Sequence, residues 1–277
     1  MSTRFRDSGR RRWPIGLAAA LALLIAGSLV AALFSLRSLE GAIPGKAAIL
    51  GFATDGRAFV IGTANRAYTS LDGRTWSAVQ GLEGPTLVAG GESGAVLLNG
   101  GKLYRSEDLR TLNPLPGEAG EAAALAVAST GEIYLATGAG RFFRAAATGR
   151  PQEIEGDRGP DEVLALAAGE GSPAPLLAGG LTSGLWRSDD GGARWSRILG
   201  TPTRAAMLDR QVAGRGFIAT AGGVLVSTDG RQWEFTDLRD AVEALAQTQD
   251  SYFAITAARL VFQSPDGLEW RQLTRER

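Results

Sequence analysis

The chain has 277 residues, a formal net charge of zero, and neither cysteine nor histidine. The lack of cysteine excludes disulfides and cysteine nucleophiles, and the lack of histidine removes the commonest general base and metal ligand. Residues 37–277 hold 24 of the 29 basic and 28 of the 29 acidic residues, a net charge of −4, which argues against nucleic acid as a partner.

The first element that the sequence predicts is a membrane anchor. Residues 15–36 form an uncharged stretch of 22 residues, about 33 Å long as a helix and so able to cross a bilayer core. Five arginines precede it, and basic residues favour the cytoplasmic side. We expect a cytoplasmic tail at 1–14, an inner-membrane helix at 15–36 and a periplasmic or extracellular remainder. A cleaved signal peptide is the alternative, but the apolar run is long for one.

Small residues recur on one face of the expected anchor helix. Ala18, Ala22 and Ala26 are four residues apart, a spacing that lets a second membrane helix approach closely. An alanine-rich composition would give the same pattern without any partner. Residues 37–46, which include Pro44 and two glycines, are expected to form a short tether to a domain at 47–277.

A short phrase containing Ser-x-Asp and ending in tryptophan is repeated along the rest of the chain. Its last three tryptophans are 38 and 37 residues apart, and a fixed period in this range indicates a solenoid or a propeller. One weaker copy has Leu112 in place of the tryptophan. The defining residues of the five copies are Ser70, Asp72, Gly73 and Trp76; Ser106 and Asp108; Ser188, Asp190, Gly192 and Trp195; Ser227, Asp229, Gly230 and Trp233; and Ser264, Asp266, Gly267 and Trp270.

Each phrase lies between two short apolar runs, as expected for the turn of a β-hairpin. Two more apolar runs precede each hairpin, for example 205–208 and 216–220, and four short strands per repeat make one propeller blade. We therefore predict an all-β domain of six four-stranded antiparallel blades, preceded by one transmembrane helix; helices in the alanine-rich stretches are the alternative. The predicted units are 47–82, 84–116, 119–156, 161–200, 203–238 and 240–274.

The repeated phrase resembles the Asp-box, or bacterial neuraminidase repeat. The copy from Ser188 to Trp195 matches the form Ser-x-Asp-x-Gly-x-x-Trp, and the likeness over 47–274 is to the propellers of sialidases, sortilin-type receptors and photosystem II stability/assembly factors. The resemblance implies that the boxes are structural turns at the blade periphery, and that seven blades are the alternative to six. A carbohydrate or calcium site on the turns is the other possibility, but one aspartate per turn supplies few of the oxygens that Ca²⁺ takes.

The resemblance also raises the question of sialidase activity. Such an enzyme needs three arginines for the substrate carboxylate, a Tyr–Glu pair and an acidic aspartate, whereas the stretch 47–59 has Arg57 alone and no Arg-Ile-Pro motif. Glu162 and Glu243 lie near the expected starts of first strands, where they could form a carboxylate pair at a channel mouth or be solvated loop residues. We expect no catalytic residue, no cofactor and no metal site.

The remaining hypothesis is a binding module. Loops on a rigid scaffold usually carry recognition, and the stretches 153–161 and 169–175 are candidates here. With the predicted anchor, the expected function is that of a membrane-anchored interaction scaffold, assembly factor or accessory subunit, with integral-membrane or peripheral protein subunits as partners. A glycan-binding or sialidase-like propeller is the alternative, and the oligomeric state is left open.

Overall fold

The computed structural model describes residues 43–273 except 56, 92–93 and 158. These residues form 24 β-strands and no helix, which confirms the all-β prediction and excludes helices in the described alanine-rich stretches. None of the same residues forms a helix able to cross a membrane. The predicted tail, the anchor helix with Ala18, Ala22 and Ala26, and most of the tether lie outside the described residues.

The strands form six consecutive groups of four, here called units 1 to 6, in which sequence neighbours pair antiparallel. Each predicted repeat therefore contains four strands. Unit 1 has β1 (Ile49–Thr54), β2 (Phe59–Thr63), β3 (Arg66–Ser70) and β4 (Ser77–Glu83); unit 2 has β5 (Thr86–Gly91), β6 (Gly94–Asn99), β7 (Lys102–Ser106) and β8 (Asn113–Glu118); unit 3 has β9 (Ala122–Val127), β10 (Ile133–Thr137), β11 (Phe142–Ala145) and β12 (Gln152–Glu153); unit 4 has β13 (Ala165–Ala168), β14 (Leu176–Gly180), β15 (Gly184–Ser188) and β16 (Ser196–Leu199); unit 5 has β17 (Ala205–Leu208), β18 (Gly216–Thr220), β19 (Gly223–Ser227) and β20 (Glu234–Phe235); unit 6 has β21 (Val242–Gln247), β22 (Tyr252–Thr256), β23 (Val261–Ser264) and β24 (Arg271–Gln272).

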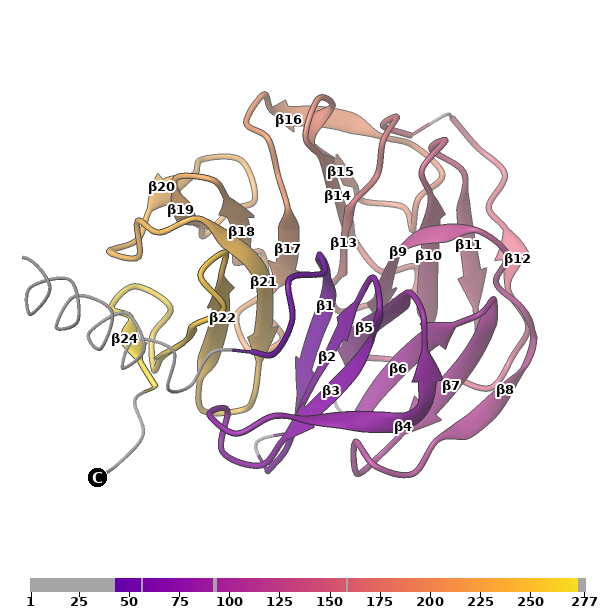
Figure 1. Cartoon of the computed structure of the whole chain (residues 1–277). Coiled ribbons are helices and arrows are strands. Elements are labelled where there is room, and N and C mark those ends of the chain that lie inside the picture. Colours follow the sequence, from indigo (N-terminus) through magenta and orange to yellow (C-terminus); the bar gives the residue numbers. More distant parts are fainter. Residues whose placement is uncertain (1–42, 56, 92–93, 158, 274–277) are drawn as a thin grey trace, which may run out of the picture. The chain divides into compact units, whose positions relative to one another are not determined.

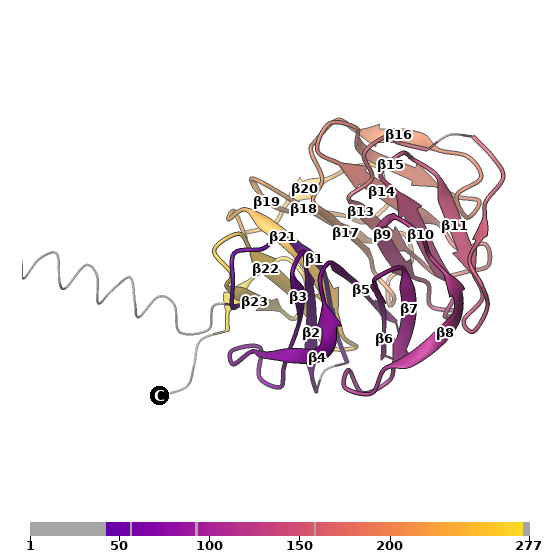
Figure 2. The same ribbon diagram turned by 45° about the vertical axis from the view of Figure 1, so that its right-hand side comes forward.

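The units are arranged around a common axis, as in a propeller (Figures 1 and 2). The first strands contact one another in the order β1, β5, β9, β13, β17, β21, and β21 contacts β1. Between units 1 and 2 this contact is close enough for parallel pairing of Gly51 with Val88. A Cβ at Gly51 would lie 2.1 Å from the Val88 carbonyl oxygen, so this approach requires glycine.

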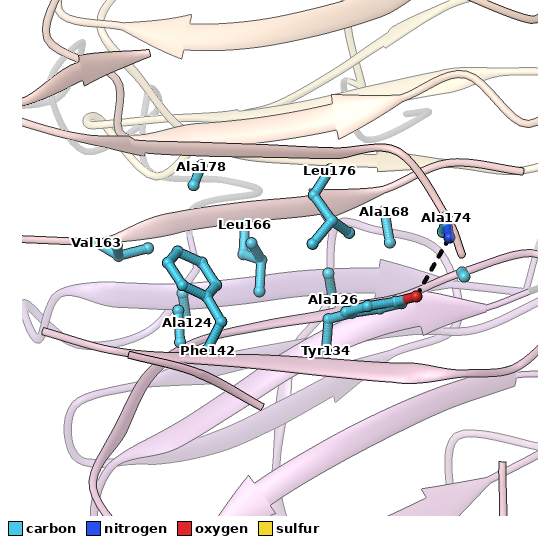
Figure 3. Close-up of a cluster of buried hydrophobic side chains, with 12 residues drawn as sticks. Ala124, Ala126, Tyr134, Phe142, Val163, Leu166, Ala168, Ala174, Leu176 and Ala178 are labelled. Carbon is cyan, nitrogen blue, oxygen red and sulfur yellow. Dashed lines mark hydrogen bonds between the residues drawn. The ribbon is translucent and has the colours of Figure 1, made fainter. Parts of the chain in front are cut away.

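Apolar side chains pack between the faces of neighbouring units. Second strands such as β2 and β18 are buried along their whole length, whereas the fourth strands β20 and β24 are exposed, as expected when only the inner strands are covered on both faces. Between units 3 and 4, Tyr134, Phe142 and Leu176 are buried in one cluster (Figure 3). The Tyr134 hydroxyl accepts the backbone N–H of Ala174 and donates to Oε2 of Glu132, both at 3.3 Å, so the phenol has a partner as acceptor and as donor.

Unit 1 packs directly against unit 6, and each supplies its own four strands. Phe59 meets Phe253 edge to face, with ring centroids 5.2 Å apart, a geometry that contributes about 0.5–1.5 kcal/mol beyond burial. Ile43 joins the same cluster, is 2% exposed, and donates its N–H to the Arg259 carbonyl at 3.0 Å. The sequence predicts that Ile43 belongs to the tether and that the domain begins at residue 47. In the structure, Ile43 already packs into the core of the domain.

Antiparallel order gives the ring axis two distinct ends. The box end is where first strands end; it carries the loops between first and second strands, such as 209–215, and the Asp-box turns between third and fourth strands. The tether end is where first strands begin; it carries the loops between second and third strands, and Ile43 is hydrogen-bonded there to Arg259 in the β22–β23 loop.

Candidate functional site

Each Asp-box closes its turn with its own serine and aspartate. In unit 1 the Ser70 hydroxyl donates to Oδ1 of Asp72 at 2.9 Å, and the same oxygen accepts the N–H groups of Arg74 and Thr75 at 2.8 and 2.7 Å. The Ser70 hydroxyl accepts the N–H of Gly73, whose φ is +68°, a conformation that glycine adopts without steric cost. The polar groups that define the box thus bind the turn's own backbone.

The weaker copy in unit 2 forms the same turn. Asp108 accepts the N–H groups of Thr111 and Arg110 at 2.6 and 2.9 Å, and these bonds lower the pKa of its carboxyl to about 2. Leu109 takes the position of the glycine, with a φ of 58°. The serine–aspartate bond recurs at 2.9–3.3 Å in all five copies. Bonds from backbone N–H groups likewise lower the pKa of Asp190, Asp229 and Asp266.

The last residue of each box packs between its own unit and the preceding one. The clusters between adjacent units include Trp76 between units 6 and 1, Leu112 between units 1 and 2, Trp195 between units 3 and 4, Trp233 between units 4 and 5, and Trp270 between units 5 and 6. Unit 3 has no box, and its turn is closed by a backbone bond from Gly149 to Ala146 at 2.9 Å. This geometry supports a structural role for the boxes. Among the described residues no group of three or more acidic side chains could hold a metal ion.

A cavity of about 280 Å³ lies on the ring axis, lined by the first strands of all six units. This volume is just below the roughly 300–1,000 Å³ of common ligand pockets. Most of its lining side chains are alanine, glycine, valine and leucine, which keep the inner strands close together. Its described polar side chains are Thr54, Arg210 and Gln247 toward the box end and Arg204 and Glu243 toward the tether end.

At the box end, a buried aspartate joins units 5 and 6. Asp209 has no exposed side-chain surface; it accepts the Tyr252 hydroxyl at 2.6 Å and the Gln247 amide at 2.8 Å, and lies 3.8 Å from Nη1 of Arg215. Burial raises the pKa of Tyr252, and the hydrogen bond to Asp209 raises it further. The next residue, Arg210, extends across the axis from unit 5 to unit 2 and donates to the Gly90 carbonyl at 2.6 Å.

The tether end of the cavity differs from the box end. Nη1 of Arg204 lies 3.9 Å from Oε1 of Glu243, with the two side chains 40% and 22% exposed. Oε2 of Glu243 is buried and has no hydrogen-bond partner among the described residues. Leu164 and Leu181 line the same cavity and are 44% and 41% exposed.

The two candidate glutamates have separate partners. The carboxylate of Glu162 accepts the N–H of Thr182 at 3.2 Å and the Thr182 hydroxyl, and Glu162 is not among the residues that line the cavity. Glu243 lines the cavity and faces Arg204. This position agrees with the suggestion from the sequence that Glu243 could reach the channel mouth. The contacts therefore do not bring the two acids together as a pair.

Sequence reasoning missed the Asp209 network and the position of Arg210. Both residues follow the short strand β17 in a loop without a motif, and their partners are 38–43 residues away in unit 6 or 120 residues away in unit 2. The repeat period could have predicted that Gln247 lies beside Asp209. Gln247 ends the first strand of unit 6, and Asp209 directly follows the first strand of unit 5. No local signal indicates the contact between Arg210 and Gly90.

Comparisons with known proteins place this geometry among propellers. No family model matches the chain. In sequence, the chain is 30% identical over 168 residues to a xyloglucanase of Hypocrea jecorina (strain QM6a). The matched region is 60% of this chain but only 18% of the length of the xyloglucanase.

The structural similarities cover most of the chain. YCF48 from Cyanidioschyzon merolae superimposes with a TM-score of 0.52 and 11% identity, covering 84% of this chain and 88% of YCF48. A structure of YCF48 bound to a D1 peptide gives a TM-score of 0.49 and 15% identity, covering 83% and 82%. At 11% identity the likeness shows the fold alone. The predicted resemblance is thereby confirmed: the chain has the propeller-like fold of the photosystem II assembly factor YCF48 and is similar in sequence to part of a xyloglucanase.

Proposed function

We propose that this chain is a non-catalytic, membrane-anchored scaffold, assembly factor or accessory subunit, whose six-bladed propeller binds protein subunits of a membrane complex. The observation that carries the proposal is the tether end of the axial cavity. There, two exposed leucines of unit 4 lie beside a mostly apolar cavity that holds one arginine–glutamate pair. Exposed apolar side chains beside a few charged groups are typical of a protein-binding surface.

The arrangement of charged groups argues against hydrolysis. A paired-carboxylate glycosidase needs two acids that converge on one cleft, whereas Glu162 is bound to Thr182 and Glu243 faces Arg204. A sialidase would also need three arginines around one substrate carboxylate. The arginines that line the cavity, Arg204 and Arg210, lie toward opposite ends of it.

The arginines that precede the stretch 15–36 give the proposed anchor a direction. With the arginine-rich tail in the cytoplasm, the propeller would lie in the periplasm or outside the cell.

A second candidate function is glycan binding or hydrolysis, which the partial similarity to a xyloglucanase favours. Its requirement is a polar or aromatic platform for a sugar ring. The box tryptophans Trp195 and Trp270 pack between units and donate their indole N–H groups to Gly192 and Gly267 within their own turns. They are therefore not free to serve as such a platform.

The test is purification of the full-length protein, tagged at its C-terminus, from gently solubilised membranes. We expect integral-membrane subunits to co-purify in stoichiometric amounts, and mass spectrometry would identify them. Recovery of the protein alone under every growth condition, together with hydrolysis or retention of xyloglucan or a sialoside, would contradict the scaffold proposal and support the glycan alternative.

A further inference from the structure

The β6–β7 hairpin at the tether end contains the sequence Asn99-Gly100-Gly101-Lys102. Asn99 pairs with Lys102, so the loop has two residues, and its glycines have φ angles of +56° and +78°. Two positive φ angles characterise a tight hairpin turn that glycine pairs favour. The hairpin therefore places a glycine nitrogen directly after an asparagine.

Asn99 holds this hairpin onto the link between units 1 and 2. Its Nδ2 donates to the carbonyl oxygens of Glu83 and Pro85 at 3.0 and 3.3 Å and to Oγ1 of Thr86 at 2.9 Å. Thr86 is buried, and its hydroxyl donates to the Gly84 carbonyl at 3.2 Å, so toward Asn99 its oxygen acts as an acceptor. All three partners of the amide are therefore acceptors, and we call these three bonds the Asn99 clamp.

The backbone nitrogen of Gly100 is accessible. Its N–H has no hydrogen-bond partner among the described residues, the glycine is exposed, and no atom lies within 4 Å of a Cβ built at this position. In the box turns of units 1 and 6, by contrast, the N–H groups of Gly73 and Gly267 donate to the box serines at 2.9 and 2.8 Å. Of these three nitrogens, each of which follows an aspartate or an asparagine, the one at Gly100 is not held by a hydrogen bond.

A free nitrogen after an asparagine can convert the side chain. The nitrogen of Gly100 attacks Cγ of Asn99 and loses its proton, the Cγ–Nδ2 bond breaks, and ammonia leaves with that proton. Water then opens the resulting cyclic imide at either of its carbonyls, which gives aspartate or isoaspartate. Glycine favours the attack because it has no Cβ to hinder it, and asparagine is among the thermolabile residues.

We infer that Asn99–Gly100 is a site of spontaneous deamidation that the Asn99 clamp controls. While the clamp is formed the amide cannot rotate freely, so the attack must wait until its bonds open. After conversion, a carboxylate oxygen replaces Nδ2 and faces the carbonyls of Glu83 and Pro85, which cannot donate to it, so the clamp does not form again. The modified chain then has an added negative charge and a loosened link between units 1 and 2, whichever partner the propeller binds.

The test uses the full-length protein in detergent micelles, incubated in mildly alkaline buffer below its unfolding temperature. Peptide mapping by mass spectrometry measures the conversion of each asparagine and separates aspartate from isoaspartate. We expect conversion at Asn99. Asn65 should stay intact because the side chain of Arg66 hinders the attack. Asn113 should stay intact because the nitrogen of Pro114 has no proton to lose.

Unfolding and matched variants test control by the clamp. In the same buffer with unfolding concentrations of urea, conversion at Asn99 should be about tenfold faster, because all three bonds are lost. Thr86→Val removes one acceptor and should speed conversion in the folded protein about fivefold. Thr220→Val removes a buried hydroxyl from the β18–β19 hairpin of unit 5 and should leave the rate unchanged.

A second pair of variants tests the consequence of the modification. Asn99→Asp imitates one product and should lower the urea midpoint of the full-length protein. Asn113→Asp, at an exposed asparagine, should change the midpoint little. Equal midpoints for the two variants would reject the loosened link.

Two outcomes would overturn the site or its control. An Asn99 that stays as intact as Asn113 in both folded and unfolded protein would reject the site. Equal rates in the folded and the unfolded natural chain would reject control by the clamp, and this comparison decides even if Thr86→Val does not fold. Neither result bears on the scaffold proposal, which co-purification tests separately.

Discussion

The two ends of the axial cavity use charged residues in opposite ways. At the box end, Asp209 has no exposed side-chain surface, and donors from both unit 5 and unit 6 surround it. At the tether end, Glu243 is partly exposed, and the ion pair that it forms among the described residues is a 3.9 Å contact with Arg204. A buried charge whose bonds are all made within the chain stabilises one structure, whereas a carboxylate without such bonds contributes little to stability.

Exposed apolar side chains occur at both ends of the ring. Toward the box end, the box residues Leu109 and Trp270 are 3% and 8% exposed in the contacts between units, whereas Leu71, in another box turn, is 63% exposed. At the tether end, Leu164 and Leu181 are exposed beside the cavity. The two tether-end leucines differ from Leu71 in that they line the cavity.

The largest expected effect is the loss of stability on removing Asp209, and it tests whether the two ends of the cavity differ. Asp209→Ala leaves the Tyr252 hydroxyl, the Gln247 amide and Arg215 without their shared acceptor, and removing one partner of a buried charged network costs about 3–5 kcal/mol. Glu243→Ala removes a carboxylate with no hydrogen bond and should cost less than about 1 kcal/mol. Urea unfolding of both variants measures the difference. Equal losses of stability would mean that the two ends are alike, and Tyr252→Phe, expected to cost about 1–2 kcal/mol, isolates one bond of the network.

A smaller effect is expected from replacing one glycine by alanine at each end, which tests how closely atoms pack around it. A Cβ at Gly267, in the last box turn, would lie 2.5 Å from the ring of the fully buried Phe217, and its φ is +75°. Gly267→Ala should therefore cost about 2–3 kcal/mol from strain and overpacking together. Gly101, at the tether end between β6 and β7, has a φ of +78° but nothing within 4 Å of a new Cβ. Gly101→Ala should cost only the roughly 1–2 kcal/mol of the backbone conformation, and an equal or larger loss would remove the distinction.

Much of the fold could be predicted from sequence because the repeat is local. The phrase from Ser227 to Trp233 contains its own turn donors, acceptors and apolar residue, so its conformation depends on few distant contacts. Even the copy without tryptophan was recognisable, since Asp108 keeps the turn. The strands of unit 5 match the predicted apolar runs closely, as β17 and β18 coincide with 205–208 and 216–220.

The candidate site was harder to predict because it is built across units. The sequence placed Glu243 near a channel mouth, but its partner Arg204 comes from the neighbouring unit 39 residues earlier, as their ion pair shows. The contact of Arg210 with Gly90 joins opposite units. Such pairs depend on the number of units in the ring and on the register of each first strand, which no local pattern contains.

The smallest expected effect concerns stability in acid, and it compares a carboxylate of a box turn with the carboxylate of Glu243 at the tether end. Because the folded pKa of Asp108 is lowered to about 2, its stabilising effect is present above the ordinary carboxyl pKa near 4 and is lost as the pH falls through about 2. Urea midpoints measured from pH 7 to pH 2 should therefore fall most steeply below pH 4. Asp108→Asn should make this fall shallower while changing the pH 7 midpoint little, because the amide oxygen still accepts the N–H groups of Arg110 and Thr111. Glu243→Gln serves as the tether-end comparison. If it flattened the acid limb as much as Asp108→Asn does, the acid-sensitive bonds would not be concentrated in the box turns, and the division between a stabilising end and a binding end would fail.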